Sequence, residues 1–232
     1  MKESMCATFE PRELVIPGDL IWEGRTRTGD NTYRKGGDVY ASRLGLVSYG
    51  KEMVSVIALE GGFTPRVGDT VVGYVTDIEL GQWKIDIGGP QDAVLRVPDA
   101  VDKPFYTSFD MPSVLDIGVT VIAKIVDMDR RRTPILSVLG RGLGKIQTGF
   151  IVEITPSKIP RLIGKKGSMI NMILKETNTN ITIGQNGRIH INGRSRKQED
   201  MVIKVIKKIE KEAHTSGLTN RVQEYLRRLK EE

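Results

Sequence analysis

The chain has 232 residues with a formal charge of +6, and 39% of its residues are hydrophobic. This length suits two or three small domains, each with enough apolar residues for a core. A single cysteine, Cys6, excludes a disulfide framework and a cysteine zinc cluster. There is no apolar run long enough to span a bilayer, and residues 1–10 lack a signal-peptide core, so a soluble cytoplasmic protein is expected.

Residues 1–64 are predicted to form a small β domain. Residues 39–49 and 53–59 alternate as two half-buried strands and favour a hairpin. A polar, glycine-marked loop at residues 24–37 precedes them and carries the cations Arg25, Arg27, Arg34 and Lys35. The loop could contact RNA, but the pattern favours a flexible solvated loop.

Residues 65–140 carry five predicted strands with a long connection, residues 98–112, between the third and the fourth, which fits an OB-fold barrel. The strands are Thr70–Ile78, Gly81–Ile87, Ala93–Val97, Val119–Asp127 and Pro134–Leu139. The run Gly73-Tyr74-Val75-Thr76-Asp77-Ile78, followed by Gly81-Gln82-Trp83, resembles OB folds of the ribosomal-S1 type.

Two features of this barrel are candidate RNA contacts. Trp83 could stack on a base, an interaction worth about 1–3 kcal/mol, or could pack the barrel surface, and Lys84 lies beside it. Arg130, Arg131 and Arg132 occupy the last turn, where they would meet phosphate or only water. Asp127 and Asp129 flank that turn and are expected to neutralise the arginines rather than to bind a metal.

Residues 141–148 form a glycine-rich linker, either a hinge or close-packed. Residues 149–232 then predict the order strand, helix, helix, strand, strand, helix. A final amphipathic helix, residues 218–230, has one apolar stripe and is expected to pack on its own domain rather than on a partner. The predicted fold class is therefore multi-domain, mainly β plus α+β.

The most informative motif is Gly164-Lys165-Lys166-Gly167, between two apolar-patterned segments. Glycines allow a sharp turn close to a ligand, and amides at the start of the next helix favour phosphate. A four-residue pattern of this kind also recurs by chance. In its full context it resembles a type I KH domain, whose GXXG loop clamps a nucleic-acid backbone. The candidate RNA-binding residues are Arg161, Ile163, Gly164, Lys165, Lys166, Gly167 and Ser168.

The flanking apolar residues are expected to form a core. They are Ile159, Leu162, Ile163, Ile170 and Ile173.

Charge supports this interpretation. Residues 151–232 hold 17 Lys and Arg against 9 Asp and Glu, a net charge of +8, whereas residues 1–150 are at −2. A positive excess in one segment indicates a polyanionic ligand. Lys207, Lys208 and Lys211 alternate with glutamates and are expected to form only a solvated helix face.

No catalytic signature is present. There is no phosphate-loop or H-E-x-x-H motif, and only two histidines, His190 and His214. The sequence therefore predicts a non-catalytic protein, with no cofactor and no metal.

The order of a small β domain, an S1-type barrel and a KH domain resembles the KH-containing cap of the archaeal exosome, as do residues 36–42 and 83–86. The resemblance covers nearly the whole chain. It implies three copies on a hexameric ring of RNase PH-like subunits, docked through the N-terminal domain. Their barrels would guide single-stranded RNA into the pore for 3′-to-5′ degradation.

Other families fit less well. The sister cap carries a zinc ribbon, which the single cysteine excludes. Bacterial-type elongation factors have two KH domains of another topology, and polynucleotide phosphorylase has two large catalytic domains that this chain lacks. A free-standing RNA chaperone, transcription factor or translation factor remains the alternative, because modules alone do not specify an assembly.

Overall fold

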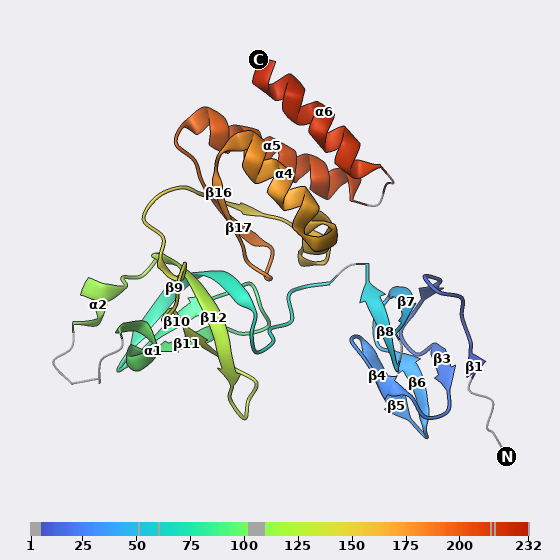
Figure 1. The fold of residues 1–232 in the computed structure, drawn as a ribbon. Coiled ribbons are helices and arrows are strands. Elements are labelled where there is room, and N and C mark those ends of the chain that lie inside the picture. The colour runs from blue at the N-terminus through green and yellow to red at the C-terminus, as the bar shows by residue number, and fades with distance from the viewer. Residues whose placement is uncertain are drawn as a thin grey trace. The chain divides into compact units, whose positions relative to one another are not determined.

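The computed structural model describes residues 6–50, 52–59, 61–101, 110–213, 215 and 217–231 (Figure 1). The chain divides into two compact units, residues 1–61 and 62–232. No helix in the described part of the chain is long and apolar enough to cross a membrane.

The first unit is a small β sandwich. Its two sheets have the orders β1-β3-β6-β5 and β2-β7-β8-β4. Their strands are β1 (Cys6–Ala7), β2 (Leu14–Val15), β3 (Leu20–Glu23), β4 (Arg27–Thr28), β5 (Thr32–Lys35), β6 (Asp38–Ala41), β7 (Gly45–Tyr49) and β8 (Met53–Ala58). Side chains that alternate along the strands meet between the sheets, among them Val15, Val47 and Val56.

The predicted hairpin is confirmed as β7–β8, although Lys51 in its turn lies outside the described residues. The predicted strand at residues 39–49 is divided between the two sheets as β6 and β7. The prediction of a flexible loop at residues 24–37 is wrong, because this segment contains β4 and β5. β4 pairs in parallel with β8, a contact between segments far apart in sequence that local patterning does not reveal.

The second unit begins with the barrel. In the described part of the chain, five strands close it in the order β13-β11-β10-β9-β12, with β12 pairing back to β13. They are β9 (Thr70–Glu79), β10 (Gln82–Asp86), β11 (Ala93–Arg96), β12 (Thr120–Met128) and β13 (Pro134–Ser137). The predicted long connection contains α1 (Val97–Val101) and the start of α2 (Met111–Val114), and its residues 102–109 lie outside the described part.

The glycine-rich segment is hydrogen-bonded to the barrel, although none of its residues is buried. Within it, β14 (Gly144–Lys145) adds to the sheet beside β12, and the Ile146 amide donates to the Thr120 carbonyl at 2.9 Å.

The remainder of the chain confirms the predicted KH order. The antiparallel sheet β15-β17-β16 is covered by helices (Figure 1). The elements are β15 (Phe150–Glu153), η1 (Pro156–Lys158), α3 (Ile159–Ile163), η2 (Lys165–Gly167), α4 (Ser168–Thr177), β16 (Asn180–Ile183), β17 (Arg188–Asn192), α5 (Arg196–Glu212) and α6 (Leu218–Glu231). The Ser195 hydroxyl accepts the Gln198 amide and caps α5. As predicted, α6 packs its apolar stripe on this core.

One core prediction needs correction. Ile170 is half-buried, and Met169 takes the core position instead. Because α4 begins only at Ser168, the side that faces the sheet is the one carrying Met169, Ile173 and Thr177 at four-residue spacing.

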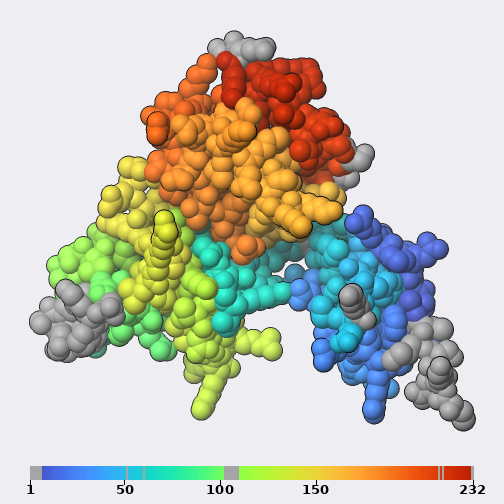
Figure 2. Space-filling view, in the orientation of Figure 1, coloured from blue at the N-terminus to red at the C-terminus, as the bar shows by residue number. Residues whose placement is uncertain are grey.

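The turn between β16 and β17 joins the KH segment to the barrel. The buried Asn186 amide donates to the carbonyls of Val72 at 2.7 Å and Ile87 at 2.9 Å, and accepts the Val72 amide at 3.3 Å. The Gln185 amide donates to the Thr70 carbonyl at 2.7 Å. Figure 2 shows the orange KH segment meeting the barrel, which is coloured from teal to yellow-green. Hydrogen bonds therefore link the two modules.

Arg188 reinforces the junction. Its guanidinium donates at 2.7 Å to both the carboxylate and the carbonyl of Asp86, and at 2.9 Å to Glu153. It also lies 4.8 Å from the centre of the Tyr74 ring. Burial opposes the ionisation of Asp86, but hydrogen bonds from Gly88 and Arg188 outweigh it and lower the pKa of Asp86.

Replacing Asn186 tests this junction. Asn186→Ala would leave the buried polar groups of Val72 and Ile87 without partners, so we expect unfolding of the barrel to become easier by roughly 2–3 kcal/mol. Urea titration followed by Trp83 fluorescence, in a Trp22→Phe background, reports on the barrel. Asn220→Ala, at an exposed position on α6, should change stability by less than about 0.5 kcal/mol. Equal effects of the two substitutions would contradict the role given to Asn186.

Candidate nucleic-acid interface

The predicted GXXG loop is an exposed turn between α3 and α4. Gly164 and Gly167 have φ angles of 74° and 78°, and Lys166 is also left-handed at 53°. A Cβ atom on Gly164 would lie 2.8 Å from the amide nitrogen and Cβ of Met169, so a side chain is excluded there by contact as well as by φ. The two glycines therefore fix the sharp turn that presents the lysines.

The loop leaves its positive charge available to a ligand. Lys165 and Lys166 are exposed, and within the described residues no ion pair or side-chain hydrogen bond is recorded for either of them. Helix α4 starts at Ser168 after Gly167, and no side-chain hydrogen bond from the residues that the structure describes caps this start. Amides at an uncapped helix N-terminus beside two cations favour an anion such as phosphate.

A cavity of about 310 Å³ lies beside the loop. Arg161, Lys165 and Ser168 line it from the loop side, and Thr215 and Thr219 line it from the segment around the start of α6. Ile163 and Ile170 are half-buried and provide apolar surface near the turn. The structure thus brings together the predicted loop residues and adds two threonines that the sequence pattern did not reveal, because they lie about fifty residues away in the chain.

Trp83 is not part of an RNA surface. Its side chain is 0% exposed, and its indole N–H donates to the Leu115 carbonyl at 2.8 Å inside the barrel. No ring face remains on which a base could stack, so the stacking prediction is wrong. The sequence contained the signal for burial, because Trp83 shares its alternation with the core residues Ile85 and Ile87.

Lys84 is half-buried, and its ammonium group already has ion-pair partners. It forms ion pairs with Glu79 and, at 3.5 Å, with Asp77. The hydrogen bond to Glu79 raises the pKa of Lys84, and the same bond lowers the pKa of Glu79. Lys84 therefore has less charge to offer to a phosphate than the loop lysines do.

The arginine turn projects all three side chains into solvent. Arg130, Arg131 and Arg132 are exposed, and Arg132 has a φ angle of 63°. Asp129 accepts the amides of Thr133 and Arg131 at 2.8 and 2.7 Å, and these bonds lower its pKa. Asp129 thus holds the backbone of the turn.

The expectation that Asp127 and Asp129 neutralise the arginines is met in part, because the charge of Arg131 is one of the causes that lower the pKa of Asp129. Asp127 accepts the amide of Met128, and no ion pair joins either aspartate to these arginines among the described residues. The turn follows the end of β12 (Figure 1). β14, which leads to the KH segment, pairs near the start of β12. The loop and the turn are therefore two separate basic surfaces.

Comparisons with known proteins agree with this architecture. Residues 12–60 match the exosome RNA binding protein RRP4 N-terminal domain, residues 62–104 the RRP4 S1 domain, and residues 149–197 the KH domain. A crystal structure described as an exosome complex RNA-binding protein superposes with a TM-score of 0.70 at 39% identity, covering 74% of this chain and 98% of that one.

Relatives match over almost the full length. The exosome complex component Rrp4 of Thermococcus kodakarensis is 42% identical, covering 96% of this chain and 90% of the relative. The Sulfurisphaera tokodaii protein of the same name is 39% identical over 94% and 90%. Fold and loop together define an RNA-binding protein with an S1 barrel and a KH domain. The chain belongs to the archaeal Rrp4 family of non-catalytic, RNA-binding exosome components.

Burial of Trp83 gives a direct test. In a Trp22→Phe variant, Trp83 should fluoresce at short wavelength, resist acrylamide quenching, and keep its emission when single-stranded RNA is added, because no solvent or base reaches the ring. Trp83→Ala should destabilise the barrel by about 3–5 kcal/mol. Quenching by saturating RNA would restore the stacking role.

Proposed function

We propose that this protein is a cap subunit that captures single-stranded RNA and guides it into the pore of a phosphorolytic exosome ring. The observation that carries the RNA contact is the outward GXXG turn, whose two lysines have no ion-pair partner in the described part of the chain, at a helix start without a side-chain cap there. The relatives named as exosome complex components support the assembly. Three copies on a hexameric ring of RNase PH-like subunits, in the cytoplasm, complete the proposal.

In this proposal, two basic surfaces contact the RNA at different positions along the strand. The KH loop binds the RNA backbone through Lys165, Lys166 and the amides that follow, with Arg161 and Ser168 in the adjoining cavity. The arginine turn at residues 130–132 meets the strand at the end of the barrel. The hydrogen bonds of Asn186 link the two modules, so in this proposal one RNA strand contacts the loop and the turn of the same subunit.

Phosphate contacts make the affinity depend on salt. For single strands, the logarithm of affinity falls with that of salt concentration by about 0.7 per neutralised phosphate. A slope near zero in the plot of the logarithm of affinity against the logarithm of salt concentration would argue against electrostatic capture.

Charge reversal in the loop tests the KH contact. Lys165→Asp with Lys166→Asp should weaken RNA binding by at least about tenfold, since it removes two phosphate contacts and adds repulsion. Lys207→Asp with Lys211→Asp is the matched control, because both lysines are exposed on α5 and the change in net charge is the same. Filter binding at fixed salt measures both, with thermal unfolding to check the fold. Equal losses would mean that net charge, not the loop, sets the affinity.

Neutralising the arginine turn tests the path through the barrel. Arg130→Ser, Arg131→Ser and Arg132→Asn together keep a residue that tolerates the left-handed position 132. We expect phosphorolysis of a tailed RNA by the reconstituted complex to slow severalfold while binding to the ring persists. Replacing Lys204, Lys207 and Lys211 by serine removes the same charge from α5 and should leave the rate unchanged. An undiminished rate in the turn variant would remove the turn from the path.

Affinity purification distinguishes the proposal from its alternative. Recovery of RNase PH-like subunits in near-stoichiometric amounts with the tagged protein supports the cap. Recovery of RNA polymerase or ribosomes without those subunits would favour a free-standing RNA chaperone, transcription factor or translation factor.

A further inference from the structure

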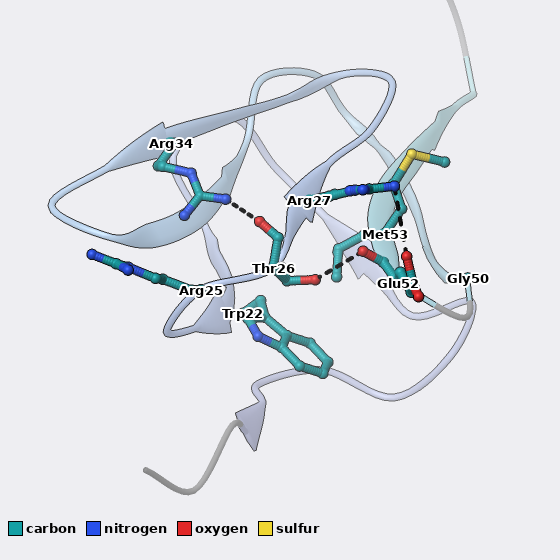
Figure 3. Close-up of a pocket in the computed structure, with 9 residues that line it drawn as sticks. Trp22, Arg25, Thr26, Arg27, Arg34, Gly50, Glu52 and Met53 are labelled. Atoms are coloured by element: carbon teal, nitrogen blue, oxygen red, sulfur yellow. Dashed lines mark hydrogen bonds and ion pairs between the residues drawn. The ribbon is translucent and has the colours of Figure 1, made fainter.

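The basic loop of the N-terminal sandwich is folded around a cavity, which we call the basic cavity. It has a volume of about 610 Å³. Its lining combines three cations, a carboxylate and an aromatic ring, which are supplied by Arg25, Arg27, Arg34, Glu52 and Trp22 (Figure 3). Small-molecule sites usually enclose about 300–1,000 Å³, so the basic cavity is large enough for one small ligand.

One polar atom in the lining lacks a partner. The indole Nε1–H of Trp22 is buried, and no group in the described part of the chain accepts its hydrogen bond. Buried indole N–H groups normally have an acceptor, because an unpaired buried donor is unfavourable. In the barrel, the indole N–H of Trp83 donates to the Leu115 carbonyl at 2.8 Å. The unpaired donor of Trp22 therefore points to a ligand that brings an acceptor atom into the basic cavity.

The basic cavity also has apolar surface. The half-buried ring of Trp22 packs on Tyr49, with ring centres 5.9 Å apart, and lines the cavity. The exposed side chain of Met53 lines it as well. A flat aromatic base packs well against a ring and a polarisable thioether. The cavity can thus hold an aromatic group beside an anion.

The three arginines differ in how firmly they are held. Arg34 donates to two backbone carbonyls, which fix its guanidinium. Arg27 pairs with Glu52 at 3.6 Å, but both side chains are largely exposed and such pairs are weak. Arg25 is exposed and has no hydrogen-bond or ion-pair partner among the described residues. Three arginines against one carboxylate leave an excess of two positive charges, on groups whose planar fork suits phosphate oxygens.

We propose that the basic cavity binds a nucleoside diphosphate. The three arginines hold its phosphate oxygens, and the indole N–H of Trp22 gains an acceptor there. The base packs against the apolar part of the lining, and the Glu52 carboxylate accepts hydrogen bonds from the ribose hydroxyls. The source of this ligand rests on the proposed function, because phosphorolysis of RNA by the ring releases nucleoside diphosphates.

Two other anions fit the lining less well. Inorganic phosphate could pair with the arginines, but it would leave the apolar part of the lining in contact with water. The interior of an RNA strand carries a single charge per nucleotide, so it matches the excess of positive charge less well than a diphosphate does. Glu52 would also repel the backbone of a strand that continues past the cavity on both sides.

The test titrates the full chain with ADP. Calorimetry should show one ADP bound per chain, and tryptophan emission should change over the same concentration range, because the ligand contacts the Trp22 ring. Trp83 is 0% exposed in the barrel and should not respond, so the change should be absent from Trp22→Phe. Inorganic phosphate should bind at least about tenfold more weakly than ADP, because it lacks the base.

A charge reversal at one position locates the site. Arg25→Glu should weaken ADP binding by at least about tenfold, because it replaces a phosphate contact by repulsion. Lys35→Glu is the matched control, since Lys35 is exposed on β5, alternates with Arg34, and is not among the residues that line the cavity. It changes the net charge equally and should alter ADP binding by less than about twofold. If Arg25→Glu unfolds the domain, Arg25→Gln replaces it and should give a smaller loss of the same sign.

Each contrary outcome is distinct. No ADP binding by the unchanged chain, or equal losses in Arg25→Glu and Lys35→Glu, would overturn the site. Equal affinities for inorganic phosphate and ADP would overturn the choice of a nucleotide. Displacement of ADP by a short single-stranded RNA, with weaker RNA binding by Arg25→Glu, would assign the cavity to RNA instead. Absence of RNase PH-like subunits from the affinity purification would overturn the proposed function, while the ADP affinity and its loss in Arg25→Glu would still stand.

Discussion

The contact between the β16–β17 turn and the barrel is the constraint on which the rest of the second unit depends. Asn186 donates hydrogen bonds to the buried carbonyls of Val72 on β9 and Ile87 after β10. Arg188 adds an ion pair with Asp86 across the same junction. Separating the modules would leave donors and acceptors unpaired on both sides. If the loop and the turn both contact RNA as proposed, the two contacts would bind more tightly than either alone, because binding at the first raises the local concentration of RNA at the second.

For binding phosphate, the location of the cations without ion-pair partners matters more than the number of cations. Several cations of the KH segment are consumed within the fold: Arg221 and Lys208 pair with Glu212, and Lys230 pairs with Glu176. The loop lysines and the arginine turn have no such partners among the described residues. The net charge of +8 that first indicated a polyanion belongs to residues 151–232 as a whole, and the arginine turn at residues 130–132 lies outside that segment. Net charge therefore does not locate the candidate contacts, whereas the two exposed turns do.

Local patterns predicted what depends on local chemistry. The apolar stripes of α5 and α6 follow the helical period, and the GXXG turn requires positive φ at both glycines. Pairing between distant segments could not be predicted in this way. The basic loop at residues 24–37 contains β4, which forms because it pairs with the distant strand β8. Asn186 lies in the turn between β16 and β17, and nothing in its local sequence indicates that it bonds to the barrel. The burial of Trp83, in contrast, could have been predicted from local sequence, because Trp83 alternates with the core residue Ile85 along β10.

The surfaces also differ in how they respond to salt. Contacts of the loop and the arginine turn with phosphate release counterions and weaken steeply as salt rises. The hydrogen bonds of Asn186 are buried between the KH segment and the barrel, so they should depend little on ionic strength. Salt that releases RNA should therefore leave the two modules joined, and the subunit would be ready to bind RNA again when the salt concentration falls.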